Sequence, residues 1–249
     1  MPEVKIYQDA THLTQAAVEQ FVQLAQDSIN ERGEFTVALS GGSTPKPIYL
    51  ELGKPKYQTL LDWKQIHLFW GDERHVLATH PDSNFRMVQE QLLMNVPIPE
   101  ENIHRVPAEL EIQAAAVKYE AEMKSYFSGE LPRFDLIFLG MGEDGHTASL
   151  FPCSAGLDEE VRWFIANFAP KEETWRLTLT KPAINAARNI LVVVQGASKA
   201  GMLADVLTGP DDPEVKPIQL IEPKDGKMIW LIDEASASDL PAWFLEQIS

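Results

Sequence analysis

Apolar residues follow two kinds of pattern along this chain. Short, nearly continuous apolar runs predict buried strands at residues 35–39, 66–70, 135–139, 161–168, 175–180, 190–195, 218–221 and 228–232. Between them, apolar positions recur every three or four residues and predict helices at residues 14–32, from Pro45 onwards, and at 83–94, 112–126 and 198–207. Helices that alternate with strands buried on both faces are typical of an α/β domain with a mostly parallel sheet.

Four of the predicted strands are followed by glycines together with hydroxyl, charged or imidazole side chains. These segments are residues 40–45, 71–74, 140–147 and 195–199. In open α/β sheets, ligands bind beyond the carboxyl ends of the strands. We therefore expect the four segments to meet in one ligand-binding site.

The first of these segments has the composition of an anion-binding loop. Gly41 and Gly42 let backbone N–H groups approach a ligand closely, and Ser43 and Thr44 add hydroxyl donors. Pro45 then begins a helix, whose N-terminus favours negative charge. The alternative is a tight strand-to-helix turn with an N-cap and no ligand. The nucleotide-binding Walker A pattern does not occur in the sequence.

Gly140, Gly142 and Gly145 form a G-x-G-x-x-G pattern after a predicted strand, as in dinucleotide-binding folds. Two features argue against a nicotinamide cofactor. An acidic residue that binds the ribose should lie at the end of the next strand, but the acids at 158–160 precede that strand. His146 also follows the last glycine directly, where a plain helix start is expected.

His146 is the strongest catalytic candidate among the six histidines. It lies beside Asp144 at a predicted strand end, and an imidazole, with an unperturbed pKa of ~6.5, suits proton transfer at neutral pH. The alternative is a histidine that caps the following helix.

His75 and His80, close to Asp72 and other acids, raise the hypothesis of a metal site. Their spacing matches no zinc pattern, so we expect solvated loop residues and no metal.

Three cations are candidate anion ligands. Lys199 follows Ser198 at a predicted helix N-terminus, where the helix dipole disfavours a cation by ~0.3–1 kcal/mol. A bound anion would explain this position, and so would simple exposure. Arg74 at a strand end and Arg176 within a strand are further candidates for binding phosphate or carboxylate. The alternative for Arg176 is a strand residue that faces solvent.

The composition limits the classes of partner. The chain has 249 residues, with 21 Lys and Arg against 37 Asp and Glu, and a formal net charge of −16. Nucleic acids and anionic membranes require a basic surface, so we expect neither as a partner. The single cysteine, Cys153, fits a reducing compartment. With neither a signal-peptide pattern nor an apolar run long enough to span a membrane, we predict a cytoplasmic protein.

Six segments resemble motifs of the 6-phosphogluconolactonase family, in order and over nearly the whole chain. They are S-G-G-S-T-P at 40–45, W-G-D-E-R at 70–74, D-S-N-F-R-M at 82–87, F-D-L-I-F-L-G-M-G-E-D-G-H-T-A-S-L-F-P at 134–152, R-L-T-L-T at 176–180 and G-A-S-K-A at 196–200. The resemblance implies a single domain at 1–249 with a three-layer α/β/α, Rossmann-like fold and a mostly parallel sheet. The family is similar to glucosamine-6-phosphate deaminases, which share that fold.

The resemblance also implies hydrolysis of 6-phospho-D-glucono-1,5-lactone to 6-phosphogluconate in the oxidative pentose phosphate pathway. This reaction requires no metal and no redox cofactor. Deaminases carry a catalytic glutamate five residues after the histidine, where this chain has Phe151, and the difference favours the lactonase. A functional link to glucose-6-phosphate dehydrogenase follows from the pathway, while the oligomeric state stays open.

Under this resemblance, His146 is the general base that activates water and then protonates the leaving ring oxygen. Asp144 or Asp72 orients the imidazole or binds sugar hydroxyls, and the sequence does not choose between them. The residues placed around the sugar phosphate substrate, including cations for the phosphate or the developing oxyanion, are Gly41, Gly42, Ser43, Thr44, Arg74, Arg176 and Lys199. The remaining alternatives are sugar-phosphate deamination or isomerisation and a non-catalytic sensor, although the chain has no basic helix-turn-helix segment.

Overall fold

A seven-stranded parallel sheet forms the centre of the molecule. The computed structural model describes residues 2–129 and 131–248. All neighbouring strands of this sheet run parallel. Their order is β1 (Glu3–Tyr7), β10 (Lys227–Asp233), β9 (Asn189–Val194), β6 (Leu136–Leu139), β2 (Phe35–Leu39), β3 (Ile66–Trp70) and β5 (Ile103–His104).

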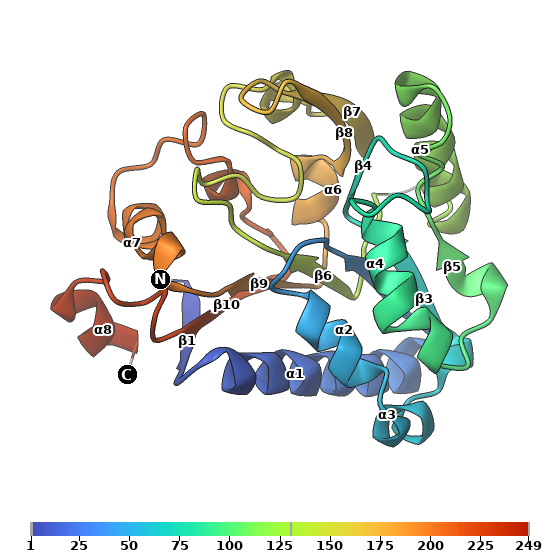
Figure 1. Ribbon diagram of the computed structural model, residues 1–249, viewed down its shortest axis with the longest axis horizontal. Coiled ribbons are helices and arrows are strands. Elements are labelled where there is room, and N and C mark those ends of the chain that lie inside the picture. Colours follow the sequence, from blue (N-terminus) through green and yellow to red (C-terminus); the bar gives the residue numbers. More distant parts are fainter. Residues whose placement is uncertain (1, 130, 249) are drawn as a thin grey trace.

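Helices cover both faces of this sheet, which confirms the predicted α/β class. Figure 1 shows α1 (Ala10–Arg32) along one face with α2 (Lys46–Leu52) and α3 (Pro55–Leu60), and α6 (Lys181–Asn185) and α7 (Ala200–Thr208) on the other. The remaining helices are α4 (Asn84–Gln91), α5 (Ile112–Tyr126) and α8 (Ala242–Ile248). Among the described residues, no helix combines the length and the apolar character needed to cross a membrane.

The sequence explains the limits of α1 and the position of β2. The Asp9 carboxylate accepts hydrogen bonds from the backbone N–H groups of Thr11 and His12, both at 2.9 Å, and so caps the first turn of α1. Gly33 ends α1 with a φ of 86°, a left-handed conformation that glycine adopts without strain. All five residues of β2 are buried, as its continuous apolar run predicts for a central strand.

A second, antiparallel sheet of three strands lies beyond the carboxyl ends of the central strands. It consists of β4 (Asp72–Arg74), β8 (Thr174–Leu179) and β7 (Phe164–Ala169), in that order. Gly71 joins it to the central sheet, since its N–H donates to Leu39 O and its carbonyl accepts from Leu179 N, both at 2.8 Å. The predicted strands at 161–168 and 175–180 therefore form a hairpin beside the central sheet.

One predicted strand is wrong. Residues Pro217–Leu220 form a 3₁₀ turn instead of the strand expected at 218–221. Pro217 has no N–H for a strand ladder, and the N–H of Gln219 donates locally to Lys216 O at 2.9 Å. A second 3₁₀ turn, Ala197–Lys199, precedes α7, so that Lys199 occupies the N-cap of that helix.

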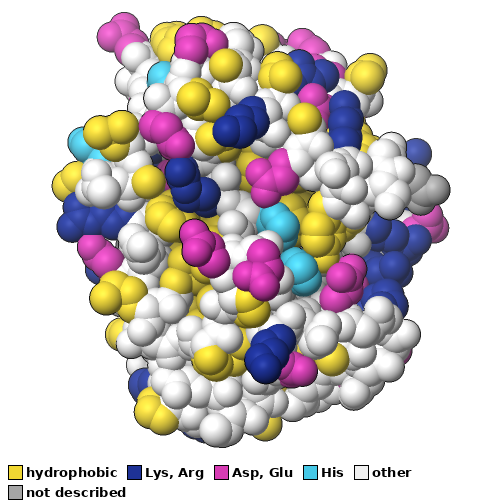
Figure 2. Space-filling view, turned by 90° about the vertical axis from the view of Figure 1, so that its right-hand side faces the viewer, with side chains coloured by type: hydrophobic (Ala, Val, Ile, Leu, Met, Phe, Trp, Pro, Cys, Tyr) yellow, Lys and Arg dark blue, Asp and Glu magenta, His cyan; other side chains and the backbone are white. Residues whose placement is uncertain are grey.

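Side chains secure the two-residue strand β5 at one edge of the central sheet. The His104 ring stacks on Phe69 with ring centroids 4.1 Å apart. His67 Nδ1 lies 3.3 Å from His104 Nε2, and the Nδ1 of His104 lies 2.9 Å from a carboxylate oxygen of Glu122. Figure 2 shows this side of the molecule, with acidic side chains gathered around two neighbouring histidines.

Candidate active site

A cavity of about 280 Å³ opens where the strand ends of the central sheet meet the small antiparallel sheet. Its walls come from the segments after β2, β3, β6 and β9, and from the β7–β8 hairpin. All four segments singled out from the sequence therefore contribute. Nine of the ten predicted site residues line the cavity: Gly41, Gly42, Ser43, Thr44, Asp72, Arg74, His146, Arg176 and Lys199. The tenth, Asp144, does not line the cavity but contacts His146.

The loop after β2 presents unpaired hydrogen-bond donors to the cavity. Gly42 has a φ of 102°, which favours glycine at this turn. Within the described part of the chain, the backbone N–H groups of Gly42, Ser43 and Thr44 and the two hydroxyls donate no hydrogen bond. Successive free N–H groups in such a turn form a concave anion-binding surface.

His146 and Asp144 are joined by a short hydrogen bond at the cavity. His146 Nδ1 lies 2.5 Å from Asp144 Oδ1, and both side chains are less than a third exposed. This hydrogen bond lowers the pKa of the Asp144 carboxyl to about 2. Because Nδ1 faces the carboxylate, the other ring nitrogen, Nε2, has no protein partner among the described residues and is free to meet a ligand. The tautomer that donates to the Asp144 carboxylate carries its proton on Nδ1.

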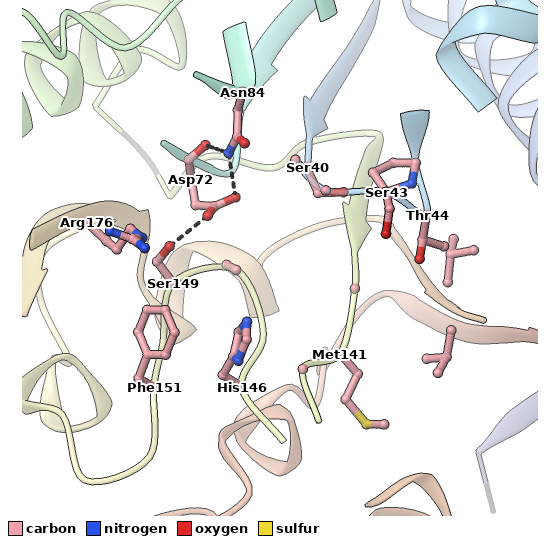
Figure 3. A pocket seen from close by; sticks show the side chains of 18 of the residues that line it. Ser40, Ser43, Thr44, Asp72, Asn84, Met141, His146, Ser149, Phe151 and Arg176 are labelled. Atoms are coloured by element: carbon pink, nitrogen blue, oxygen red, sulfur yellow. Dashed lines mark hydrogen bonds between the residues drawn. The ribbon is translucent and has the colours of Figure 1, made fainter. Parts of the chain in front are cut away.

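Asp72 makes a separate set of contacts and does not hydrogen-bond to His146. Its Oδ2 accepts from the Ser149 hydroxyl at 2.7 Å. The side-chain amide of Asn84 donates to the Asp72 carbonyl at 2.9 Å and, more weakly, to its Oδ1 at 3.4 Å. Figure 3 shows Asp72 between Asn84 and Ser149, with His146 apart from it. Of the two aspartates, Asp144 is therefore the one that contacts the imidazole.

Two arginines stand directly opposite each other on β4 and β8. Arg74 and Arg176 are register partners in this antiparallel pair. Arg74 Nη1 donates to Asp82 O at 2.6 Å, whereas Arg176 forms an ion pair with Glu172 and donates to Thr174 Oγ1 at 3.1 Å. Only 16% of the Arg176 side chain is exposed, so it does not simply face solvent.

Among the polar residues that line the cavity, Asn84, Ser149 and Glu172 received no role from the sequence. Asn84 is buried, and its place depends on Glu73, whose carboxylate accepts from the N–H groups of Asn84 at 2.7 Å and Phe85 at 2.8 Å. Burial raises the pKa of Glu73. Glu73 lies eleven residues before Asn84, so the capping rule, which applies to the neighbouring Ser83, gave no sign of this contact.

Phe151 lies against the candidate base. Its ring centroid is 4.6 Å from that of His146, so an apolar ring covers one side of the imidazole.

The two histidines that raised the hypothesis of a metal site have other partners. His75 Nε2 lies 2.8 Å from Leu110 O, and His80 Nδ1 accepts from Asp82 N at 3.2 Å. Across residues 2–129 and 131–248, no three His, Cys, Asp or Glu side chains are grouped so that they could hold a metal ion.

Comparisons with known proteins place the chain in a family. Residues 8–230 match the family described as glucosamine-6-phosphate isomerases/6-phosphogluconolactonase. A 6-phosphogluconolactonase of Nostoc sp. is 41% identical over 241 residues, covering 95% of this chain and 98% of the relative. One of Synechocystis sp. is 41% identical over 243 residues, covering 96% and 98%.

Solved structures of the same fold are similar to this chain over nearly its whole length. The 6-phosphogluconolactonase from Thermotoga maritima has a TM-score of 0.81 at 30% identity, covering 94% of this chain and all of that one. A monomeric glucosamine-6-phosphate deaminase has a TM-score of 0.81 at 19% identity, covering 95% and 99%, a likeness that shows the shared α/β fold. The chain therefore belongs to the glucosamine-6-phosphate isomerases/6-phosphogluconolactonase family.

Proposed function

We propose that this protein hydrolyses 6-phospho-D-glucono-1,5-lactone to 6-phospho-D-gluconate in the oxidative pentose phosphate pathway. The observation that carries the proposal is the pairing of His146 with Asp144 at a cavity whose other walls offer free N–H groups and three cations. Ester hydrolysis requires a base, donors for an oxyanion and, for this substrate, a phosphate anchor. The cavity holds groups suited to all three.

In the proposed mechanism, His146 Nε2 takes a proton from water as the water oxygen bonds to the lactone carbonyl carbon. The negative charge that develops on the carbonyl oxygen is stabilised by N–H groups or cations of the cavity. The bond from this carbon to the ring oxygen then breaks, and His146 returns the proton to that oxygen. Asp144 holds the Nδ1 proton and stabilises the imidazolium that forms between the two steps.

The residues around the sugar have simpler proposed roles. Asp72, fixed by Ser149 and Asn84, accepts hydrogen bonds from sugar hydroxyls. The segment 41–44, together with Arg74, Arg176 and Lys199, binds the phosphate or the oxyanion. The chemistry consumes only water, so the proposal includes no metal and no redox cofactor. We place the protein in the cytoplasm, where glucose-6-phosphate dehydrogenase would supply the lactone.

Phe151 favours this reaction over sugar-phosphate deamination. In a deaminase, a carboxylate at this position takes part in proton transfer. Here the position holds an apolar ring packed on His146, and it cannot move a proton. The lactonase mechanism requires only the single base that His146 provides.

The test is lactone hydrolysis. The lactone is generated in situ with glucose-6-phosphate dehydrogenase, and its product is followed as NADPH formed by added 6-phosphogluconate dehydrogenase, after spontaneous ring opening is subtracted. We expect a clear acceleration by the wild type and a kcat about 10²- to 10⁴-fold lower in His146→Ala. If the folded protein gives no acceleration, the proposal is wrong. Ammonia release from glucosamine 6-phosphate would then indicate a deaminase, and binding of 6-phosphogluconate without turnover a sensor.

A further inference from the structure

The two facing arginines of the small sheet repel each other. Arg74 and Arg176 are directly opposed on β4 and β8, and like charges in opposed positions destabilise an antiparallel pair. Both side chains line the cavity. Across the described residues, no carboxylate lies within 4 Å of the Arg74 guanidinium or the Lys199 ammonium. Two of the three cations, Arg74 and Lys199, therefore have no carboxylate partner in the described part of the chain, and such cations are suited to an anionic ligand.

Glu172 is the exception in this cluster. It lies in the turn between β7 and β8, and its Oε2 forms an ion pair with Arg176 Nη2. Its side chain is 45% exposed and lines the same cavity. A carboxylate that faces an anion-binding cavity weakens the binding of any anion, unless the ligand displaces it.

We propose that Glu172 and the substrate's phosphate compete for the same side of the Arg176 guanidinium. In the ligand-free protein Glu172 occupies it, and on binding the phosphate replaces Glu172. This exchange makes Glu172 a specificity-determining residue. The inference rests on the proposed function, because it assigns the phosphate to Arg176. A phosphate monoester carries a charge of about −1.5 to −2, so it binds a guanidinium more strongly than a carboxylate of charge −1 does. A sugar lactone without phosphate leaves the ion pair intact and gains nothing from Arg176.

The geometry allows the exchange. Glu172 is in a turn and half-exposed, so its side chain can move into solvent without opening the core. Arg176 is held by more than Glu172, since its Nη1 also donates to Thr174 Oγ1 at 3.1 Å and to Trp175 O at 3.3 Å. These two bonds keep the guanidinium at the cavity wall when the carboxylate leaves.

The first test measures the binding of inorganic phosphate, which requires no turnover. We expect Glu172→Gln to bind phosphate about 3- to 10-fold more tightly than the wild type at constant ionic strength, because the competing charge is gone. Glu173→Gln is the matched control, since Glu173 is the next residue of the turn, is exposed and does not line the cavity. Its phosphate affinity should stay at the wild-type value.

A second comparison isolates Arg176. In an Arg176→Gln background, Glu172→Gln should change phosphate affinity by less than about 1.5-fold, since the two effects are coupled through one contact. In turnover, Glu172→Gln should lower KM for the phosphorylated lactone by the same 3- to 10-fold and leave kcat unchanged, with no change for unphosphorylated glucono-1,5-lactone.

The outcomes separate this inference from the proposed function. Equal phosphate affinities for the wild type, Glu172→Gln and Glu173→Gln overturn it, as does a gain that persists without Arg176 or the absence of saturable binding to any variant. If the wild type hydrolyses the lactone but Glu172→Gln is unchanged, the function stands and the exchange is wrong. If Glu172→Gln tightens phosphate binding but no lactone is hydrolysed, the exchange stands and the lactonase proposal is wrong.

Discussion

At the scale of single residues, the hydrogen bond between His146 and Asp144 links the charge of one carboxyl to stability. It lowers the pKa of Asp144 from 3.8 to about 2. A carboxyl whose pKa is lower in the folded state stabilises the protein fully above its unfolded-state pKa, and this stabilisation is lost as the pH falls through the folded-state value. The Asp144 carboxylate therefore remains charged at any pH at which lactone hydrolysis would be assayed.

We expect the wild type to have a higher free energy of unfolding than Asp144→Asn. Above about pH 4 the difference should be constant, and it should decrease as the pH falls towards about 2. Urea unfolding of both proteins at about pH 6, 4 and 3 measures the difference. The comparison between the two proteins removes the contributions of all other carboxyls that titrate in both. A difference that does not depend on pH would contradict the assigned hydrogen bond.

Gly142 leaves no room for a side chain beside the candidate base. A Cβ atom there would lie 2.1 Å from His146 Nδ1. Gly142→Ala must therefore displace the imidazole, and a misplacement of about 1 Å costs roughly 100-fold in rate. We expect kcat for the lactone to fall by about that factor while KM changes less. Gly140→Ala is the control, because a Cβ atom at Gly140 meets nothing within 4 Å; wild-type kcat in both variants would refute the argument.

At the scale of elements, Glu73 connects the start of α4 to the cavity. Its carboxylate is buried and accepts from the N–H groups of Asn84 and Phe85. Glu73→Ala leaves these donors without a partner, so we expect a loss of about 1–3 kcal/mol in the free energy of unfolding. Glu90→Ala on the same helix removes only an exposed ion pair with Arg86 and should cost about 0.5 kcal/mol or less.

Urea unfolding of the two variants measures this contrast. Since Asn84 donates to the Asp72 carbonyl, Glu73→Ala should also lower lactone turnover, whereas Glu90→Ala should leave it unchanged. Equal stabilities of the two variants would show that Glu73 does not cap α4 in solution.

Apolar periodicity predicted the central strands and the long helices because these elements bury most of their surface. β2 is buried at all five positions, and its boundaries at Phe35 and Leu39 match the prediction. The edge strand β1 was missed because only one of its five residues, Val4, is buried, so the strand carries no continuous apolar run. The two-residue strand β5 is too short for any pattern, and side-chain contacts hold it.

At the scale of the whole molecule, the site forms because parallel strands end at one edge of the sheet. That topological rule was enough to predict that the loops after β2, β3, β6 and β9 would meet, and they line one cavity. The rule does not describe side-chain contacts. It left open which aspartate touches His146, because that contact depends on the conformation of the loop after β6. It gave no sign that Glu172 lies on Arg176, because that contact depends on the turn between β7 and β8.

The cations of the cavity are unusual in a chain with a net charge of −16. Arg74 comes from β4, Arg176 from β8 and Lys199 from the turn after β9, so only the folded chain brings them together. An anionic substrate is repelled by the molecule as a whole, and these three side chains must offset that repulsion locally. Removal of one should therefore affect binding more than the loss of a surface charge elsewhere.

We expect Arg74→Ala and Lys199→Ala each to raise KM for the phosphorylated lactone by about 10- to 100-fold, the usual value of a hydrogen bond to a charged group. Lys118→Ala is the control, since it removes the same charge from an exposed position on α5 and should leave KM within about twofold of the wild-type value.

An unchanged kcat in the Arg74 or Lys199 variant means that the cation binds ground state and transition state equally, as a phosphate ligand does. A fall in kcat equal to the fall in kcat/KM would instead place that cation at the oxyanion, and wild-type kinetics in both variants would exclude the two residues from substrate binding.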